Sequence, residues 1–379
     1  MRWGLYSSPS STIFTSLCGS GYPVVVDENR QTETRTQDAA TGDEDFVGFE
    51  ALAHLHHAYF LGLQLMVSTR CGSEVMGDWM FKLFRRQHLD KFLSSFTKLG
   101  LDDLPHAVAC AKYHVLSNGV GGVPVEYMYE SDTKAWVRFR YPRWMYHGPT
   151  ICGATEEVST GFLRGWYAYN GVSLGNPRLG YVCVSQDMTG EFGLCGYFKE
   201  YDHNLSDDER LVYAKDERPP VFREEDQPSP PDASWNAARL AKANRNYAVE
   251  YVRNGLVQLT EVIGAERCRE LADLSAKLIG MQYAREIFAM FDEPMDDPAG
   301  LRRVMARLFR GMGDHVETLA DGTLDQGGLR VVRGLDAEAQ QLILEPWAQL
   351  FVGMGRSQRQ ILDVQYELGT TNITWRVGD

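Results

Sequence analysis

A proline-rich segment near the middle of the chain restricts how the chain can fold. Residues 202–234 hold five of the fifteen prolines, together with many charges and little apolar material. Because proline lacks a backbone N–H group and favours extended backbone, the segment is predicted to be a linker or a strap over the surface. It separates two halves of similar length, residues 46–201 and 235–379. The polar stretch that ends residues 1–45 has no periodicity, so those residues are predicted to be a disordered leader.

Each half shows the same order of predicted elements, with long helices first and helices alternating with β-hairpins afterwards. In the first half, helices are predicted at 46–69, 74–99, 105–117 and 156–169, and hairpins pair 123–130 with 135–141 and 179–185 with 192–198. In the second half, helices are predicted at 235–262, 265–291, from 297 onward and at 336–356, and hairpins pair 315–319 with 329–332 and 361–367 with 372–377. Local helices and hairpins of this kind predict an α+β fold, in which each half packs helices on one face of an antiparallel sheet.

The ends of the two halves are similar in detail. Trp166 in the first half and Trp347 in the second are each followed by a glycine region and a hairpin with a short turn. The two hairpins end in the sequences Cys195-Gly196-Tyr197-Phe198 and Thr374-Trp375-Arg376-Val377. Two explanations stay open: chance similarity between generic helix–hairpin units, and a divergent internal duplication, which the shared order favours.

Composition excludes several classes of protein. With 38 Lys and Arg against 51 Asp and Glu, the net charge of −13 argues against a general nucleic-acid binder. No apolar run is long enough for a membrane-spanning helix, and seven cysteines without a CxxC pair suggest free thiols and a cytoplasmic protein. The common nucleotide, esterase and zinc-protease motifs are missing. A small molecule is the expected partner, and a homodimer is left open.

The strongest catalytic candidate is a row of three side chains on one predicted helix. His106, Cys110 and His114 are spaced four residues apart and therefore share one face. A thiol between two imidazoles is a candidate nucleophile, because a neighbouring cation stabilises the thiolate. The same spacing suits metal binding, and a small buried cysteine with histidines at its edge is the structural alternative.

A second group of side chains suggests a metal site. His54 and His57 lie one turn apart on a predicted helix, and Glu50 lies one turn earlier. Two histidines and a carboxylate are common ligands of zinc, although a helix packed among aromatic residues explains the same pattern. The cofactor prediction is therefore either none or a single divalent metal, with Glu126 or Glu50 as the base in a metal–water mechanism.

Residues 138–201 combine arginines, glycines and aromatic residues, as a small-molecule pocket requires. Arginine binds a carboxylate through two parallel donors, but Arg138 and Arg140 alternate on a strand and are equally compatible with solvated side chains. Arg164 and Tyr169 belong to the same stretch. The predicted substrate-binding residues are Arg138, Arg140, Trp144, Trp166, Cys195 and Tyr197.

The sequence TGEFGLCGYF at residues 189–198 resembles the terminal hairpin of a bacterial family that includes L-2-amino-thiazoline-4-carboxylate hydrolase. That family is in turn distantly similar to 4-vinyl reductase-type ligand-binding domains. Cys195 matches the family cysteine by position, whereas the aspartate that usually follows it is Gly196 here. The resemblance implies hydrolysis of a ring C–N bond in a small carboxylated heterocycle, by a thiolate or by metal-bound water. The alternative function is a non-catalytic pocket that senses or carries a small molecule.

Overall fold

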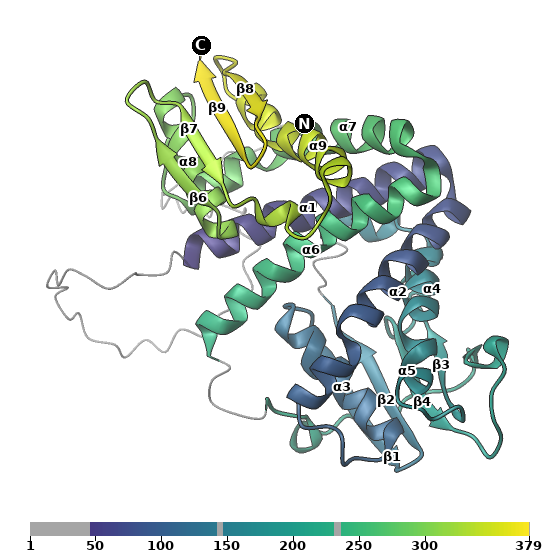
Figure 1. Ribbon diagram of the computed structural model, residues 1–379. Helices are drawn as coiled ribbons and strands as arrows, with labels where there is room; N and C mark the ends of the chain where they lie inside the picture. The colour runs from purple at the N-terminus through teal and green to yellow at the C-terminus, as the bar shows by residue number, and fades with distance from the viewer. Residues whose placement is uncertain (1–45, 142–146, 231–235, 379) are drawn as a thin grey trace, which may run out of the picture. The chain divides into compact units, whose positions relative to one another are not determined.

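The computed structural model describes residues 46–141, 147–230 and 236–378, and it confirms the α+β fold with two similar halves (Figure 1). The predicted leader and Trp144 lie outside the described residues. In the first half, the helices are α1 (Phe46–Cys71), α2 (Ser73–Lys98), α3 (His106–Val120), α4 (Glu156–Gly165) and α5 (Asn170–Ser173), and the strands are β1 (Val125–Ser131), β2 (Lys134–Phe139), β3 (Leu179–Ser185) and β4 (Cys195–Glu200). Strand β5 (Leu211–Tyr213) follows within the proline-rich segment.

The second half repeats this order. Its helices are α6 (Ala237–Ile263), α7 (Ala265–Met290), α8 (Pro298–Met312) and α9 (Ala337–Arg356), and its strands are β6 (His315–Thr318), β7 (Leu324–Gly327), β8 (Asp363–Leu368) and β9 (Asn372–Gly378). The first sheet has the strand order β1-β2-β4-β3-β5 and the second has the order β6-β7-β9-β8. Four antiparallel strands therefore share one topology in the two halves, as an internal duplication produces. The fifth strand, β5, pairs in parallel with β3 and has no equivalent in the second sheet.

Strand register aligns the two halves residue by residue. Phe198 and Trp375 take the same position, since each is fully buried and pairs with an aromatic residue of the preceding strand, Tyr181 and Tyr366 respectively. Counting back three residues from each, the position of Cys195 is taken by Asn372 in the second half. The second sheet thus lacks the hairpin cysteine, with Asn372 rather than Thr374 as its equivalent.

Two helix pairs correspond between the halves, α2 with α4 and α7 with α9, and both approach closely at glycines. A Cβ atom on Gly161 of α4 would lie 2.6 Å from the Cβ of Met80, and one on Gly280 of α7 would lie 1.9 Å from the carbonyl oxygen of Leu350. Neither helix pair has space for a side chain at these crossings, so glycine permits the helices to pack at this distance. Helix α1 also packs against α6, α7 and α8, and thereby joins the two halves.

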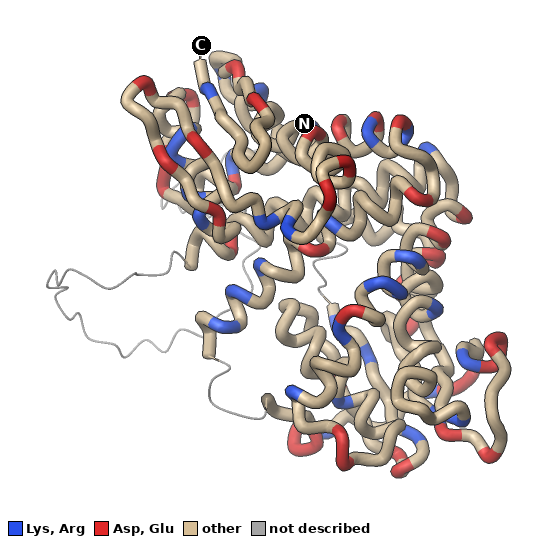
Figure 2. Tube along the Cα trace, viewed as in Figure 1, with Lys and Arg blue, Asp and Glu red and all other residues tan. Residues whose placement is uncertain are grey.

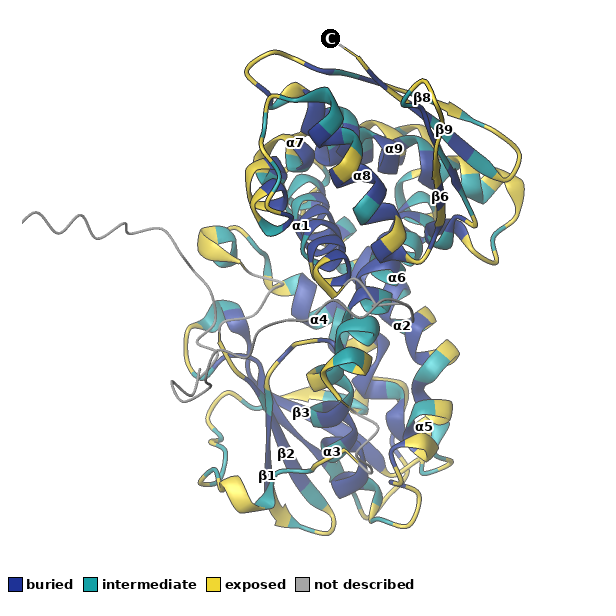
Figure 3. Cartoon of the chain, turned by 90° about the vertical axis from the view of Figure 1, so that its left-hand side faces the viewer, coloured by how far each residue is buried: buried dark blue, intermediate teal, exposed yellow. Residues whose placement is uncertain are grey.

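The two sheets differ in what covers them. All seven residues of β3 are buried, whereas the strands of the second sheet alternate between buried and exposed positions (Figure 3). We call residues 202–230 the strap, because they cover the second face of the first sheet. Phe222 and Ala214 of the strap pack on a cluster of side chains on that face, Met128, Trp136, Val182, Val184, Cys195 and Tyr197.

Side-chain hydrogen bonds hold the strap in place. Gln227 accepts a hydrogen bond from the backbone N–H of Tyr127 at 2.9 Å and donates one to its carbonyl at 2.8 Å. The hydroxyl of Tyr197 donates to Glu217 at 2.8 Å. The segment predicted as a linker or strap therefore supplies a strand, an apolar cover and specific hydrogen bonds, where it is described.

The predicted starts of two helices are confirmed, and one predicted strand is wrong. Asp297 and Asp336 cap α8 and α9, each accepting hydrogen bonds from backbone N–H groups of the first turn. The second strand of the hairpin that begins at β6 is Leu324–Gly327, not residues 329–332. Gly328 adopts φ +72°, which ends the strand, and Arg330–Val332 form a short 3-10 helix. The β-branched valines of that helix misled the prediction.

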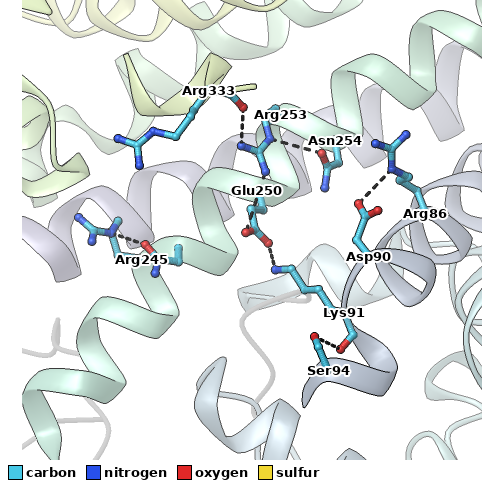
Figure 4. Close-up of polar contacts among 10 residues, drawn as sticks. Arg86, Asp90, Lys91, Ser94, Arg245, Glu250, Arg253, Asn254 and Arg333 are labelled. Atoms are coloured by element: carbon cyan, nitrogen blue, oxygen red, sulfur yellow. Dashed lines mark hydrogen bonds and ion pairs between the residues drawn. The ribbon is translucent and has the colours of Figure 1, made fainter. Parts of the chain in front are cut away.

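Charged residues of both signs are interspersed along the trace (Figure 2), and an ion pair joins α2 to α6 (Figure 4). Lys91 of α2 forms an ion pair with Glu250 of α6. Arg253 of α6 donates a hydrogen bond to the carbonyl of Arg333 at 3.1 Å. Burial and the nearby Arg253 lower the pKa of Lys91 to about 8. None of the described helices is long and apolar enough to cross a membrane.

Candidate functional site

The predicted nucleophile lies in the core of the first half. Cys110 of α3 is fully buried, and burial raises the pKa of its thiol far above the usual value. His114, one turn later, lies with its Nε2 2.9 Å from the amide nitrogen of Asn170, and its ring stacks on Tyr167 at 3.8 Å. Burial also lowers the pKa of His114, so its ring is neutral. The described surroundings of Cys110 therefore lack the cation that a stable thiolate requires.

The other predicted acid–base and metal-binding residues are apart from Cys110. His106 lies near the start of α3, with its Nδ1 3.0 Å from the amide nitrogen of Asn176. His54 contacts the carboxylate of Glu286 at 2.9 Å, while His57 is buried and Glu50 is exposed. Among the described residues, no three His, Cys, Asp or Glu side chains form a group that would hold a metal ion.

The two arginines predicted to bind a carboxylate bind one within the protein. Glu126 of β1 lies opposite Arg138 of β2 and accepts a hydrogen bond from its Nε at 2.7 Å. The other oxygen of Glu126 pairs with Arg140. Both oxygens of Glu126 are thus paired with guanidinium groups, which engages the predicted base and part of the donors of both arginines. The sequence predicted a hairpin that puts residues 126 and 138 on neighbouring strands, but it did not give the register that pairs them.

The remaining predicted residues lie on opposite faces of the first sheet. Cys195 and Tyr197 face the strap, and burial raises the pKa of Cys195 to about 12. Trp166 lies in the larger core together with Cys110. Because the sheet separates the two groups, the described candidates do not line one common cavity.

A pocket of about 330 Å³ lies elsewhere in the first half, between the strap and the helices. Helices α2 and α4 and the short 3-10 helix Tyr167–Tyr169 form one wall, and the strap forms the other. We call it the strap pocket. Its lining residues are Phe81, Thr160, Arg164, Ala168, Tyr169, Asp207, Asp208, Arg210, Leu211 and Tyr213.

Aromatic rings and guanidinium groups alternate along the strap pocket. Tyr169 lies between two arginines, with the Cζ of Arg85 3.7 Å and that of Arg210 5.7 Å from the centre of its ring. The guanidinium of Arg164 lies 5.2 Å from the centre of the Phe81 ring. Cation–π contacts of this kind place the guanidinium groups of Arg164 and Arg210 along the pocket wall.

Two charges in the strap pocket have no counter-charge in the protein. Arg210 pairs with Asp207 at 3.0 Å. Within the described ranges, by contrast, Arg164 contacts no carboxylate, and Asp208 forms no hydrogen bond or ion pair. Tyr213 closes the pocket from the strap, with its hydroxyl 3.3 Å from that of Thr160. The arrangement offers one cation, one anion and aromatic walls to a small molecule.

None of the residues predicted from the sequence to form a site lines this pocket. Arg164 and Tyr169 belong to the stretch that was singled out, whereas Asp208, Arg210 and Tyr213 lie in the segment predicted as a linker. The signal for a strand there was the short apolar run 211–213, which is rich in β-forming residues. When the chain is compared with protein-family models, with curated proteins and with solved structures, none matches it. The resemblance to the thiazoline-carboxylate hydrolase family stays a prediction.

Proposed function

We propose that the protein binds a small organic molecule with a carboxylate and a cationic nitrogen in the strap pocket, without converting it. The observation that carries this proposal is the presence of an unpaired guanidinium, Arg164, and an unpaired carboxylate, Asp208, among the described residues of one pocket. A ligand with both charges can pair with Arg164 and Asp208 at the same time. A purely anionic ligand would be repelled by the carboxylate of Asp208.

Arg164 suits the carboxylate of the ligand. Its guanidinium presents a planar fork of donors that matches two carboxylate oxygens. The contact with Phe81 fixes the plane of the fork, so less side-chain freedom is lost on binding.

Asp208 and the aromatic residues suit the cationic part. A protonated amine or isothiourea is attracted by the carboxylate and by the ring of Tyr213. The volume of about 330 Å³ is at the lower end for small-molecule sites, which favours a ligand with a single ring.

Binding is favoured over hydrolysis because the nucleophiles are elsewhere. No cysteine or histidine lines the strap pocket, and the described thiols Cys110 and Cys195 are buried with raised pKa values. Thiolate attack on a ligand in this pocket therefore has no local nucleophile.

Calorimetric titration with three related probes tests the proposal. The probes are 2-aminothiazoline-4-carboxylate, 2-aminothiazoline without the carboxylate, and thiazoline-4-carboxylate without the amino group. The first should bind most tightly, and mass spectrometry should recover it unchanged. Arg164→Gln should weaken both carboxylates by about tenfold and leave 2-aminothiazoline unaffected, because one charged hydrogen-bonding pair is lost.

Two further variants complete the design. Asp208→Asn should weaken the two amino-containing probes only. Arg70→Gln replaces an exposed arginine of α1 that does not line the pocket, so it should change nothing. Equal affinity of the native protein and Arg164→Gln for every probe would refute the proposal, and a ring-opened product would favour the hydrolase alternative.

A further inference from the structure

A second pocket lies in the other half of the chain, between helix α8 and the β6–β7 hairpin. It has a volume of about 470 Å³. We call it the arginine pocket, because four of its ten lining residues are arginines of α8. The lining residues are Glu293, Ala299, Arg302, Arg303, Ala306, Arg307, Arg310, Thr318, Gly322 and Leu324.

Arg302 is held in a fixed position by the backbone around it. Its Nη1 donates a hydrogen bond to the carbonyl of Val377 in β9 at 3.1 Å. A Cβ atom on Gly322 would lie 3.3 Å from the Nε of Arg302, and Gly322 adopts φ +83°, so glycine makes the close approach possible. One of the five N–H donors of the guanidinium is used by Val377, and the others remain for a ligand.

Arg310 is held in the same way two turns further along α8. Its Nη2 donates a hydrogen bond to the carbonyl of Val316 in β6 at 3.2 Å. Eight residues of helix separate it from Arg302, which is about 12 Å along the axis. Both arginines are therefore oriented by the sheet rather than by an acidic partner.

Two of the four arginines of the pocket, Arg302 and Arg310, have no acidic partner among the described residues. Arg303 donates hydrogen bonds to both carboxylate oxygens of Glu293. Its Nε lies 2.9 Å from Oε1, and its Nη2 lies 2.7 Å from Oε2. Arg307 donates to the carbonyl of Phe291 at 3.3 Å. In the part of the chain that the structure describes, neither Arg302 nor Arg310 contacts a carboxylate. A chain with a net charge of −13 thus concentrates positive charge at one pocket.

The corresponding helix of the first half shows that the fold does not need these arginines. Helices α3 and α8 both have 15 residues. When their first residues are aligned, Arg302 corresponds to Cys110 and Arg310 to Asn118. Cys110 is fully buried, and α3 packs on β1, β2 and β4 with no cation at these positions. The arginines therefore represent a property of the second half alone.

We propose that the arginine pocket binds a small organic phosphate with at least two negative charges. Two pinned guanidinium groups and the hydroxyl of Thr318 offer more donors than one carboxylate can accept, whereas phosphoryl oxygens are numerous and match the fork of arginine. Both arginines line one pocket of about 470 Å³, so a ligand with two phosphoryl groups, or with one phosphoryl and a second anionic group, offers acceptors to both.

Titration with inorganic pyrophosphate tests this site. Pyrophosphate should raise the melting temperature of the full chain and bind less tightly at high salt, because part of the attraction is screened. Arg302→Gln and Arg310→Gln should each weaken its affinity by about tenfold or more, as expected for the loss of a charged hydrogen-bonding pair. Arg356→Gln, on the exposed surface of α9, serves as the matched control and should not change the affinity.

Additional variants separate a binding role from a structural one. Arg310→Lys keeps the charge but loses the fork, so it should weaken pyrophosphate binding without changing the melting temperature of the free protein. Arg164→Gln, in the strap pocket, should bind pyrophosphate as the native protein does, which keeps the two proposals distinguishable. The inference is overturned if pyrophosphate has no effect, if both arginine variants bind it normally, or if only an acidic peptide binds.

Discussion

Lowering the pH from about 7 to about 5 should remove several kcal/mol from the free energy of unfolding, because four histidines are buried without charge. They are His56, His57, His88 and His114, all of which are buried. Burial lowers the pKa of His56, His57 and His88 to about 3, and it also lowers the pKa of His114 well below the usual value. These four side chains come from α1, α2 and α3, so the effect concerns the core of the first half and its contacts.

Hydrogen bonds support the uncharged form independently. The Nε2 of His56 accepts a hydrogen bond from the indole of Trp347 at 3.0 Å. The Nδ1 of His88 lies 2.8 Å from a guanidinium nitrogen of Arg85, which can only donate. Protonation of either ring would place two donors against each other in a buried site, which is unfavourable.

The sign and size follow from linkage. The unfolded chain binds a proton to each histidine below a pKa of about 6.5, whereas the folded chain does so only near 3, so stability is lost as the pH falls through 6.5. At pH 5 each of these histidines lowers the free energy of unfolding by about 2 kcal/mol, so the three with a pKa near 3 lower it together by about 6 kcal/mol. Burial raises the pKa of Asp314 to about 6, which acts in the opposite direction below pH 6 and offsets about 1 kcal/mol.

Urea denaturation followed by tryptophan fluorescence at a series of pH values measures this loss. His88→Gln keeps an acceptor for Arg85 but does not titrate, so the difference in stability between pH 7 and pH 5 should shrink by about 2 kcal/mol. His203 is exposed and its hydrogen bond to Asp202 raises its pKa, so this residue adds stability as the pH falls and His203→Gln should not shrink the difference. Equal stability of the native protein at the two pH values would refute the reasoning.

Two further predictions concern packing. Gly280→Ala should destabilise the chain by more than about 2 kcal/mol in urea, because the new Cβ would overlap the carbonyl of Leu350, whereas Gly119→Ala in α3 meets no atom within 4 Å and should stabilise by about 0.5–1 kcal/mol. If the two substitutions had equal effects, the close packing of α7 and α9 would be contradicted. Gln227→Ala removes both hydrogen bonds to Tyr127, so trypsin should cut the strap several-fold faster than in the native chain; an unchanged rate would show that these bonds do not hold it.

Much of the fold was predictable because its signals are local. Helical spacing, the caps at Asp297 and Asp336 and the short-turn hairpins each depend on a few neighbouring residues. The repeated order of these elements led to the two-half architecture. The prediction was wrong for the second strand of one hairpin. It assigned that strand to the β-branched valines 331 and 332, whereas the strand is β7, whose buried positions are Leu324 and Gln326.

The candidate site was harder to predict because it depends on which face of a sheet each side chain occupies. Spacing placed His106, Cys110 and His114 on one helix face, but it did not indicate that this face would be covered by the sheet. It also did not indicate that the strap would return to pair with β3 and line a pocket together with α2 and α4. Contacts between residues far apart in the sequence set burial, and burial decides whether a thiol or an imidazole carries charge.

Alkylation of the native protein tests this last point on the thiols. Cys110, Cys183, Cys195 and Cys268 are buried, Cys71 is half-buried and Cys152 is exposed. Burial raises the pKa of Cys183 and Cys195 to about 12, so at pH 8 only about one molecule in ten thousand carries either thiolate. Among the six cysteines that the structure describes, iodoacetamide should therefore label Cys152 first and leave the four buried ones unmodified until urea unfolds the chain, as peptide mass spectrometry will report. Cys152→Ser removes this exposed site and serves as the control. If Cys110 in the folded chain were labelled as fast as Cys152, the conclusion that the buried thiols are protonated would be contradicted. A thiolate mechanism would then have to be considered again.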